Sequence, residues 1–327
     1  MKLRELGEFG LIARIAGQVG RKSGVRIGIG DDAAAVEPSP GCITLVTADM
    51  LVEGVHFDLT LCDPITLGRK SLAVNLSDIA AMGGKPRHFL LSLALPDSLS
   101  VEFLDDFIGG LLEMAGEFDV ALIGGDTCAS QGGLVISVTV MGEQIPERVI
   151  GRGGARAGDL IFVTGTLGDA ALGLRLLRAG ERSGPAVTKH LNPPPRVREG
   201  MELAEAGIAT AMIDVSDGLL ADLGHILDLS GAGARLDLAK VPLSESFLEQ
   251  RFARTEDPFL LPLAGGEDYE LLFTASPAQQ EAIGTLLNRL GTRVSVIGEV
   301  TAAGGLRVVA ADGSDYRAAV TGYNHFL

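Results

Sequence analysis

The chain has 327 residues, which is longer than a single hydrophobic core usually supports, so its length predicts two domains. Apolar residues make up 46% and charged residues 21%, a composition that excludes disorder throughout the chain. The net charge of −15 argues against nucleic acid as a partner, because phosphate backbones are bound through lysine and arginine.

Cysteine usage and hydropathy indicate the compartment. Cys42, Cys62 and Cys128 are scattered and form no CxxC pair, so neither a disulfide framework nor a structural zinc site is expected. No segment approaches the roughly 18 consecutive apolar residues that a membrane-spanning helix needs. We expect a cytoplasmic protein that binds neither nucleic acid nor a membrane.

Apolar spacing in the first half predicts helices and strands in alternation. The expected helices cover residues 8–19, 65–82 and 100–118. The expected strands cover residues 25–29, 43–47, 89–95, 120–123 and 134–141. The aspartates that follow these strands are therefore expected at strand ends.

The stretch RGGARAGD, residues 152–159, predicts a boundary near residue 150, which gives domains 1–150 and 151–327. The second half again alternates strands and helices. Strands are expected at 160–164, 211–214, 235–238 and 294–300, and helices at 168–179, after Pro195, from a cap at Ser216, and at 277–290.

Five aspartates have no adjacent lysine or arginine: three close apolar runs, one follows a Gly-Ile-Gly turn, and one lies on the predicted helix 65–82. They are Asp32, Asp49, Asp78, Asp126 and Asp214. Taken singly, each is most simply a helix cap or a turn residue. Taken together, converging carboxylates repel unless they are protonated or bridged by a cation, and Mg²⁺ is the hard cation that prefers such oxygens.

The stretch GIGDDAAAV, residues 28–36, contains two adjacent carboxylates. If the chain is extended there, Asp31 and Asp32 point to opposite sides and cannot serve equally. The sequence contains no GxxxxGK[ST], no HExxH and no GxSxG, so phosphate-loop, zinc-protease and serine-hydrolase chemistry are disfavoured. Metal-assisted phosphoryl transfer is the favoured reaction class.

Motifs spread over the whole chain resemble the thiamine-monophosphate kinases. They are GIGDDAAAV, DMLVEGVHF, NLSDIAAMGGKP, LIGGDT, VTGTLGDAALGL, IDVSDGLLADLGHI, GGEDYELLFT and the terminal GYNHF. NLSDIAAMG, GGDT and SDGL are similar to a wider superfamily that includes aminoimidazole ribonucleotide synthetase. DMLVEGVHF, GGEDYEL and GYNHF point to the thiamine enzymes.

The resemblance implies ATP-dependent phosphorylation of thiamine monophosphate to thiamine diphosphate with several Mg²⁺ ions. It implies an α+β fold of two mixed α/β domains. The N-terminal domain, which binds ATP and Mg²⁺, would pair its sheet across a homodimer. The C-terminal sheet would be covered by helices, and this domain would complete the nucleotide and substrate site. No catalytic general base is expected, because the acceptor phosphate is already ionised at neutral pH.

The resemblance also implies roles for individual residues. The implied metal ligands are Asp32, Thr47, Ala48, Asp49, Asp78, Asp126, Asp214 and Asp217. The implied ATP contacts are Gly125, Asp126, Arg152 and Ser216, and the implied substrate contacts are His56, Glu267 and Tyr323. Ala48 departs from the serine or threonine usual in the family, so any side-chain ligand there is lost.

Two alternatives remain open from the sequence. One is a sister ATP-dependent synthetase of the same superfamily that acts on a purine precursor. The other is a non-catalytic nucleotide or Mg²⁺ sensor that has kept the fold.

Overall fold

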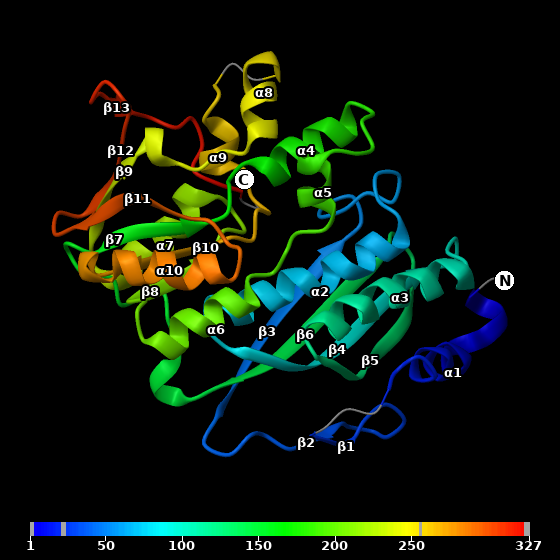
Figure 1. Ribbon diagram of the computed structural model, residues 1–327. Helices are drawn as coiled ribbons and strands as arrows, with labels where there is room; N and C mark the ends of the chain where they lie inside the picture. The colour runs from blue at the N-terminus through cyan, green and yellow to red at the C-terminus, as the bar shows by residue number, and fades with distance from the viewer. Residues whose placement is uncertain (1–2, 21–23, 255–256, 324–327) are drawn as a thin grey trace. The chain divides into compact units, whose positions relative to one another are not determined.

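The computed structural model describes residues 3–20, 24–254 and 257–323, which form two compact units (Figure 1). The first unit comprises residues 1–79 and 85–146, and the second comprises residues 80–84 and 147–327. Both units combine a sheet with helices, so the predicted mixed α/β class is confirmed. The roles assigned to domains 1–150 and 151–327 stay predictions.

The first unit is built on a four-stranded sheet in the order β3-β6-β4-β5. Its strands are β3 (Ile43–Val52), β6 (Val135–Gln144), β4 (Lys85–Pro96) and β5 (Ala121–Ser130). A separate ribbon pairs β1 (Val25–Ile27) with β2 (Ala35–Val36). The helices are α1 (Leu3–Ala16), α2 (Pro64–Ala81) and α3 (Val101–Glu117), with Ser100 capping α3 as predicted.

Helices α2 and α3 lie over one face of this sheet (Figure 1). Alternate residues of the central strands, including Phe89, Leu91 and Val138, are buried on that face. On β3 the residues of opposite parity are exposed, with Val46 at 64% and Met50 at 58% of their maximal accessibility. Among the described residues, the β3 part of this face is therefore apolar and exposed.

The second unit is built on a seven-stranded sheet in the order β13-β12-β9-β11-β7-β10-β8. The strands are β7 (Leu160–Thr164), β8 (Ala211–Asp214), β9 (Gly233–Asp237), β10 (Leu271–Ala275), β11 (Val294–Thr301), β12 (Gly305–Val309) and β13 (Asp315–Tyr316). The α-helices are α4 (Asp169–Arg178), α5 (Pro185–Leu191), α6 (Val197–Ala206), α7 (Leu219–Ser230), α8 (Glu245–Arg254), α9 (Leu260–Ala264) and α10 (Gln280–Arg289).

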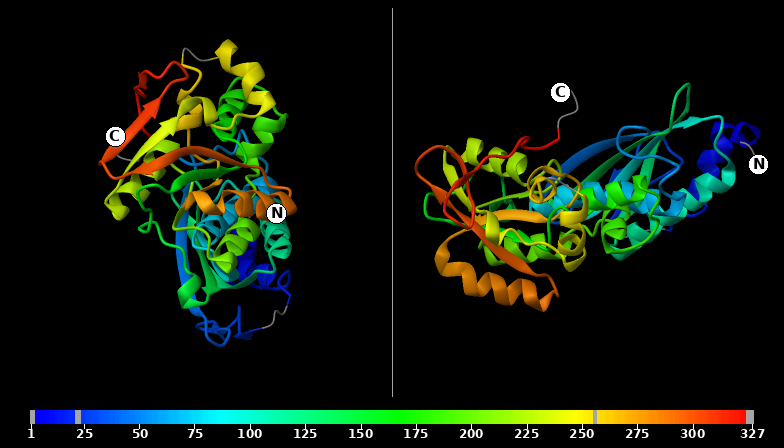
Figure 2. Two further views of the ribbon diagram at one scale, coloured as in Figure 1. Left: turned by 60° about the vertical axis from the view of Figure 1, so that its left-hand side comes forward. Right: turned by 90° about the horizontal axis from the view of Figure 1, so that it is seen from above.

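Apolar packing holds helices against both faces of this sheet. The core that includes Leu219, Leu223 and Ile226 of α7 also contains Ile161 and Ile213 of the strands. Helix α10 lies on the other face (Figure 2) and buries Ile283 and Leu287. The predicted covering of the C-terminal sheet by helices is confirmed.

Several elements differ from their predicted limits. Strands β3 and β5 continue well past the predicted ends at 47 and 123, because their ladders to β6 and β4 extend to Val52 and Ser130. Asp49 and Asp126 therefore lie inside strands, and the prediction that they end them is wrong. Asp214 does end β8.

A stacked aromatic pair fixes the centre of the second sheet. Phe162 of β7 and Phe273 of β10 have ring centroids 5.1 Å apart and planes 8° apart, and both are fully buried. We expect Phe273→Ala to lower the free energy of unfolding of this unit by about 3–5 kcal/mol, because it removes buried area and leaves a cavity. Denaturant unfolding measures this. Leu229→Ala, at an exposed position of α7, is the control. Equal losses of unfolding free energy in both variants would show that burial of Phe273 is not the cause.

Candidate functional site

Two loops of the second unit lie against each other: residues 215–218 after β8 and residues 265–270 before β10. The Glu267 N–H donates to the Ser216 carbonyl at 2.8 Å, and the Tyr269 N–H donates to the Val215 carbonyl at 2.9 Å. A Cβ placed on Gly266 would lie 2.2 Å from the Ser216 oxygen, so only glycine allows this approach. The motifs IDVSDGL and GGEDYEL therefore form one structural unit.

Asp222 organises the loop after β8 and was not predicted as a site residue. Its Oδ2 accepts the N–H groups of Ser216, Asp217 and Gly218 at 3.0–3.1 Å. Burial raises the pKa of Asp222 to about 7, and the nearby charge of Asp217 adds to this against the opposing hydrogen bonds. An acid in the first turn of α7 that reaches back to preceding N–H groups is a signal available in SDGLLAD.

Asp222 also explains why the predicted cap at Ser216 is wrong. The residue before α7 is Gly218, with φ 123°, and no side chain caps it. The loop N–H groups are instead bound from inside the helix by Asp222. Ser216 is thereby left in the loop beside Glu267.

Tyr323 joins the same loops through its backbone. Its N–H donates to the Asp217 carbonyl at 3.0 Å, and its side chain is 53% exposed. The rest of the GYNHF motif, residues 324–326, lies outside the described residues. The structure thus brings together Ser216, Asp217, Glu267 and Tyr323, with Asp214 two residues earlier at the end of β8.

Arg152 is placed differently from Ser216. Its carbonyl accepts the Ser230 hydroxyl at the C-terminal end of α7, whereas Ser216 precedes the N-terminal end of that helix. A helix of this length spans about 18 Å at 1.5 Å per residue. Within the second unit, the main chain of Arg152 is therefore not beside Ser216, and its nucleotide role stays a prediction.

In the first unit, β3 and α2 bring three predicted ligands together. The Thr47 hydroxyl donates to Asp78 Oδ2, and the Asp49 N–H donates to Asn75 Oδ1 at 3.0 Å. Burial raises the pKa of Asp49 to about 6, and the Asp78 charge adds to the shift. Ala48, between Thr47 and Asp49, has its side chain on the opposite face of the strand.

A groove of about 910 Å³ in the first unit holds the other predicted ligands, Asp32 and Asp126. Gly30 has φ 117°, and the Asp32 N–H donates to Asp31 Oδ1 at 3.0 Å, so this stretch turns and is not extended. The expectation that Asp31 and Asp32 point to opposite sides required an extended chain, so it does not hold. Both residues line the groove. A Cβ on Gly125 would lie 1.7 Å from the Leu91 carbonyl, so β5 requires glycine beside Asp126.

The ladder register separates these two groups of ligands. Met50, Ser137, Ser92 and Asp126 form one rung across the sheet, so Asp126 lies on the same face as Met50. Asp49 lies on the adjacent rung and faces α2. Strands β3 and β5 are the two edges of the sheet, about 14 Å apart at the usual strand spacing. Within one chain, Asp49 and Asp126 thus face opposite sides of the sheet.

His56 lies in the turn after β3. Its Nδ1 accepts the Val52 N–H at 3.0 Å, so the proton of the neutral ring is on Nε2. Glu53 Oε2 accepts the Leu134 N–H at 2.7 Å and ties this turn to β6. The turn therefore fixes the orientation and the tautomer of the histidine ring.

Across the described part of the chain, no three His, Cys, Asp or Glu side chains are gathered in the geometry of a metal centre. Asp49 instead lies beside Asp78, and Asp32 and Asp126 line one groove. Among the same residues, no helix is long and apolar enough to cross a membrane.

Comparison with known proteins identifies the family. The AIR synthase related protein N-terminal domain matches residues 30–144, and the C-terminal domain of the same family matches residues 156–311. The chain is 40% identical over 328 residues to the thiamine-monophosphate kinase of Escherichia coli K12, covering 98% of each chain. It belongs to the thiamine-monophosphate kinase family.

Solved structures agree with this assignment. The thiamine-monophosphate kinase of Stenotrophomonas maltophilia K279a is 39% identical, with a TM-score of 0.84 over 97% of this chain and 99% of that one. AaThiL complexed with AMPPCP and TMP is 36% identical, with a TM-score of 0.77 over 100% of this chain and 99% of that one. The E. coli hydrogenase maturation protein HypE, at 21% identity, shares the fold.

For this member of the thiamine-monophosphate kinase family, the pKa of Asp49 predicts a pH-dependent stability. Its pKa rises from the model-peptide value of 3.8 to about 6 on folding, so its ionised form destabilises the folded state above that pH. Below pH 3.8 the Asp49 carboxyl is mostly protonated in both the folded and the unfolded state, so it no longer lowers the free energy of unfolding. We expect Asp49→Asn to stabilise the metal-free protein by about 1–3 kcal/mol at pH 8.

This gain should shrink as the pH falls from 6 to 4. Thermal unfolding in a chelator at several pH values measures it. An Asp49→Asn gain that does not vary with pH would show that the ionised carboxylate is not the cause.

Proposed function

We propose that this chain transfers the terminal phosphoryl group of ATP to thiamine monophosphate and so forms thiamine diphosphate, as a step of thiamine diphosphate biosynthesis. The observation that carries the proposal is the match to thiamine-monophosphate kinases at 40% identity over 98% of both chains. A relative matched over 100% of this chain is complexed with AMPPCP, an ATP analogue, and TMP.

The chemistry explains why the site is rich in acids. The acceptor is a phosphate whose second pKa is near 6, so no side chain needs to remove a proton from it. The main barrier is the repulsion between two polyanions that must come within bonding distance. Positioning and neutralisation of charge are therefore the tasks of the site.

The donor set fits Mg²⁺, which prefers hard oxygen ligands. Burial and the charge of Asp78 both disfavour an ionised Asp49, and a bound divalent cation relieves that cost. Mg²⁺ supplies charge neutralisation of the phosphates when bound. The proposed ligands are Thr47, Asp49 and Asp78; Asp32 and Asp126; Asp214 and Asp217; and Ala48 through its carbonyl oxygen alone.

The remaining predicted residues divide between nucleotide and substrate. Gly125, Asp126, Arg152 and Ser216 are proposed to contact ATP, with Arg152 donating to phosphate oxygens. His56 donates from Nε2 to the substrate phosphate, and Glu267 attracts the thiamine cation. The half-exposed ring of Tyr323 adds about 1 kcal/mol or more through a cation–π contact.

The direct test is incubation of purified protein with ATP, Mg²⁺ and thiamine monophosphate, with thiamine diphosphate as the expected product. We expect Asp126→Asn to lower kcat by on the order of 100-fold or more, because it removes a charge that binds metal at the transferring phosphoryl group. Its side chain is exposed, so the unfolding temperature should change little.

Asp97→Asn is the matched control, an exposed aspartate of the same unit that lies outside the site. Absence of product from the wild-type protein at saturating substrates would refute the proposed function. Full activity of Asp126→Asn at limiting Mg²⁺ would refute the metal role of Asp126 alone.

We propose in addition that the enzyme is a homodimer that pairs its N-terminal sheets. The support is the apolar face of β3, where Val46 and Met50 are 64% and 58% exposed, on a strand that no other described strand pairs on its outer side. Exposed apolar patches on edge strands are typical of association surfaces.

The dimer proposal predicts that Met50→Asp yields a monomer of 34.0 kDa, because a carboxylate would be buried without a partner. Sedimentation equilibrium measures the mass. Leu229→Asp, which charges an exposed leucine of the second unit, should leave the dimer intact. A monomeric wild-type protein, or a dimer unaffected by Met50→Asp, would exclude this interface.

A further inference from the structure

The segment 267–270 alternates strained backbone with buried charge. Glu267 and Tyr269 have φ values of 68° and 50°, a left-handed conformation that costs energy for residues other than glycine. Between and after them, the side chains of Asp268 and Glu270 are fully buried. Such a conformation persists only where surrounding contacts determine it.

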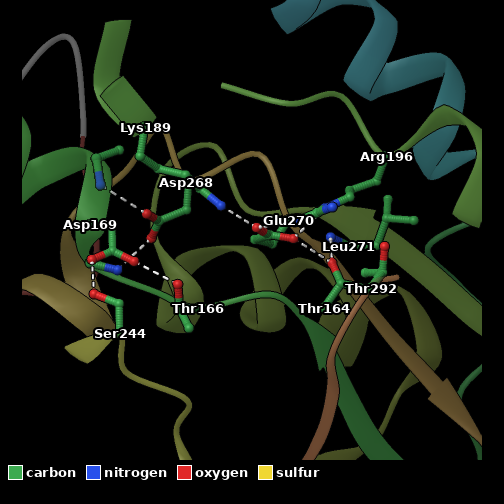
Figure 3. A network of polar contacts seen from close by, with 12 residues as sticks. Thr164, Thr166, Asp169, Lys189, Arg196, Ser244, Asp268, Glu270, Leu271 and Thr292 are labelled. Atoms are coloured by element: carbon green, nitrogen blue, oxygen red, sulfur yellow. Dashed lines mark hydrogen bonds and ion pairs between the residues drawn. The ribbon is translucent and has the colours of Figure 1, made fainter. Parts of the chain in front are cut away.

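Glu270 is held by two cations from outside its own loop (Figure 3). Lys189 of α5 donates to Oε1, and Arg196 donates from Nε to Oε2 at 2.6 Å and from Nη2 to Oε1 at 2.8 Å. Burial alone would raise the pKa of Glu270, but these two charges outweigh it and lower the pKa to about 2. Glu270 is therefore a fixed anion that anchors one end of the segment to α5.

Asp268 anchors the middle of the segment to another helix. Its carboxylate accepts the Gly168 N–H at 2.7 Å and the Ala170 N–H at 3.2 Å, at the N-terminal end of α4. With the backbone bonds of Glu267 and Tyr269 to residues 215 and 216, the main chain on both sides of Glu267 is fixed. The orientation of the Glu267 side chain involves a further contact.

His190 supplies that contact. It follows Lys189 on α5, its side chain is 8% exposed, and its Nδ1 lies 3.3 Å from Glu267 Oε2, within ion-pair distance but without the geometry of a hydrogen bond. Glu267 is more open, at 29%. Helix α5 thus contacts two carboxylates of GGEDYEL: Lys189 contacts Glu270, and His190 contacts Glu267. Of these two carboxylates, only that of Glu267 reaches solvent.

We infer that His190 is a positioning residue for the substrate: its ring lies against one oxygen of Glu267 and so leaves the other to face the thiamine cation. The inference rests on the proposed function, in which Glu267 contacts the thiamine moiety. His190 does not itself touch the substrate. Its contribution is a carboxylate that is already oriented before the substrate binds, which lowers the entropic cost of binding.

The test compares His190→Leu, which keeps the side-chain volume and removes the donor, with His190→Asn, whose amide nitrogen lies near the position of Nδ1. We expect His190→Leu to raise KM for thiamine monophosphate about tenfold and to leave KM for ATP and kcat within about twofold, which is the pattern of lost substrate binding. His190→Asn should restore KM to within about threefold of the wild-type value.

A double-mutant cycle with Glu267→Gln separates positioning from a general structural role. If His190 acts through Glu267, His190→Leu has little further effect once Glu267 is replaced. Equal KM increases in both backgrounds, or equal effects of Leu and Asn, would overturn the inference. His225→Ala, an exposed histidine of α7, is the control that should change nothing.

Two further outcomes are distinguishable. An active wild-type enzyme whose KM for thiamine monophosphate is unchanged by His190→Leu refutes the inference and leaves the proposed function standing. A wild-type protein with no activity on thiamine monophosphate refutes both. If His190→Leu does not fold, His190→Gln, which moves the donor away from the Nδ1 position, takes its place in the cycle with the same expected KM increase.

Discussion

The second unit depends on one recurring interaction, a buried carboxylate that satisfies backbone N–H groups of a neighbouring loop. Asp222 does this for residues 216–218, and Asp268 does it for the start of α4. An N–H left unpaired in the interior costs on the order of 1–3 kcal/mol, so these acids determine which loop conformations are stable. The proposed ATP contact Ser216, metal ligand Asp217 and substrate contact Glu267 lie in the loops shaped in this way.

Charge in this protein therefore has two separate uses. Asp222, Asp268 and Glu270 are buried and bonded, and they shape the loops. Asp32 and Asp126 line an open groove, where a carboxylate can exchange water for a cation. Asp49 lies between these extremes, since it is largely buried beside Asp78 and carries a raised pKa. A carboxylate in that position fits a metal ligand better than a structural cap.

Elements with long, regular apolar patterns were predictable from sequence. Strands β7 and β8 have their predicted limits, and α2 and α3 differ from prediction by a residue or so at each end. The extension of β3 and β5 was not predictable, because Asp49 interrupts the apolar run of β3 and glycine and polar residues continue β5. Both strands are extended by pairing with strands that are distant in sequence. Helix α5, which carries Lys189 and His190, is only seven residues long and gives no clear periodic pattern.

The sequence by itself determined the fold class, the family and the residue types of the site, because motifs and apolar periodicity are local properties of the chain. Only the tertiary structure decided which acids act together. Strand register places Asp49 and Asp126 on opposite faces of one sheet, and loop packing places Glu267 beside His190. Both depend on contacts between residues far apart in the chain, about which a local pattern carries no information.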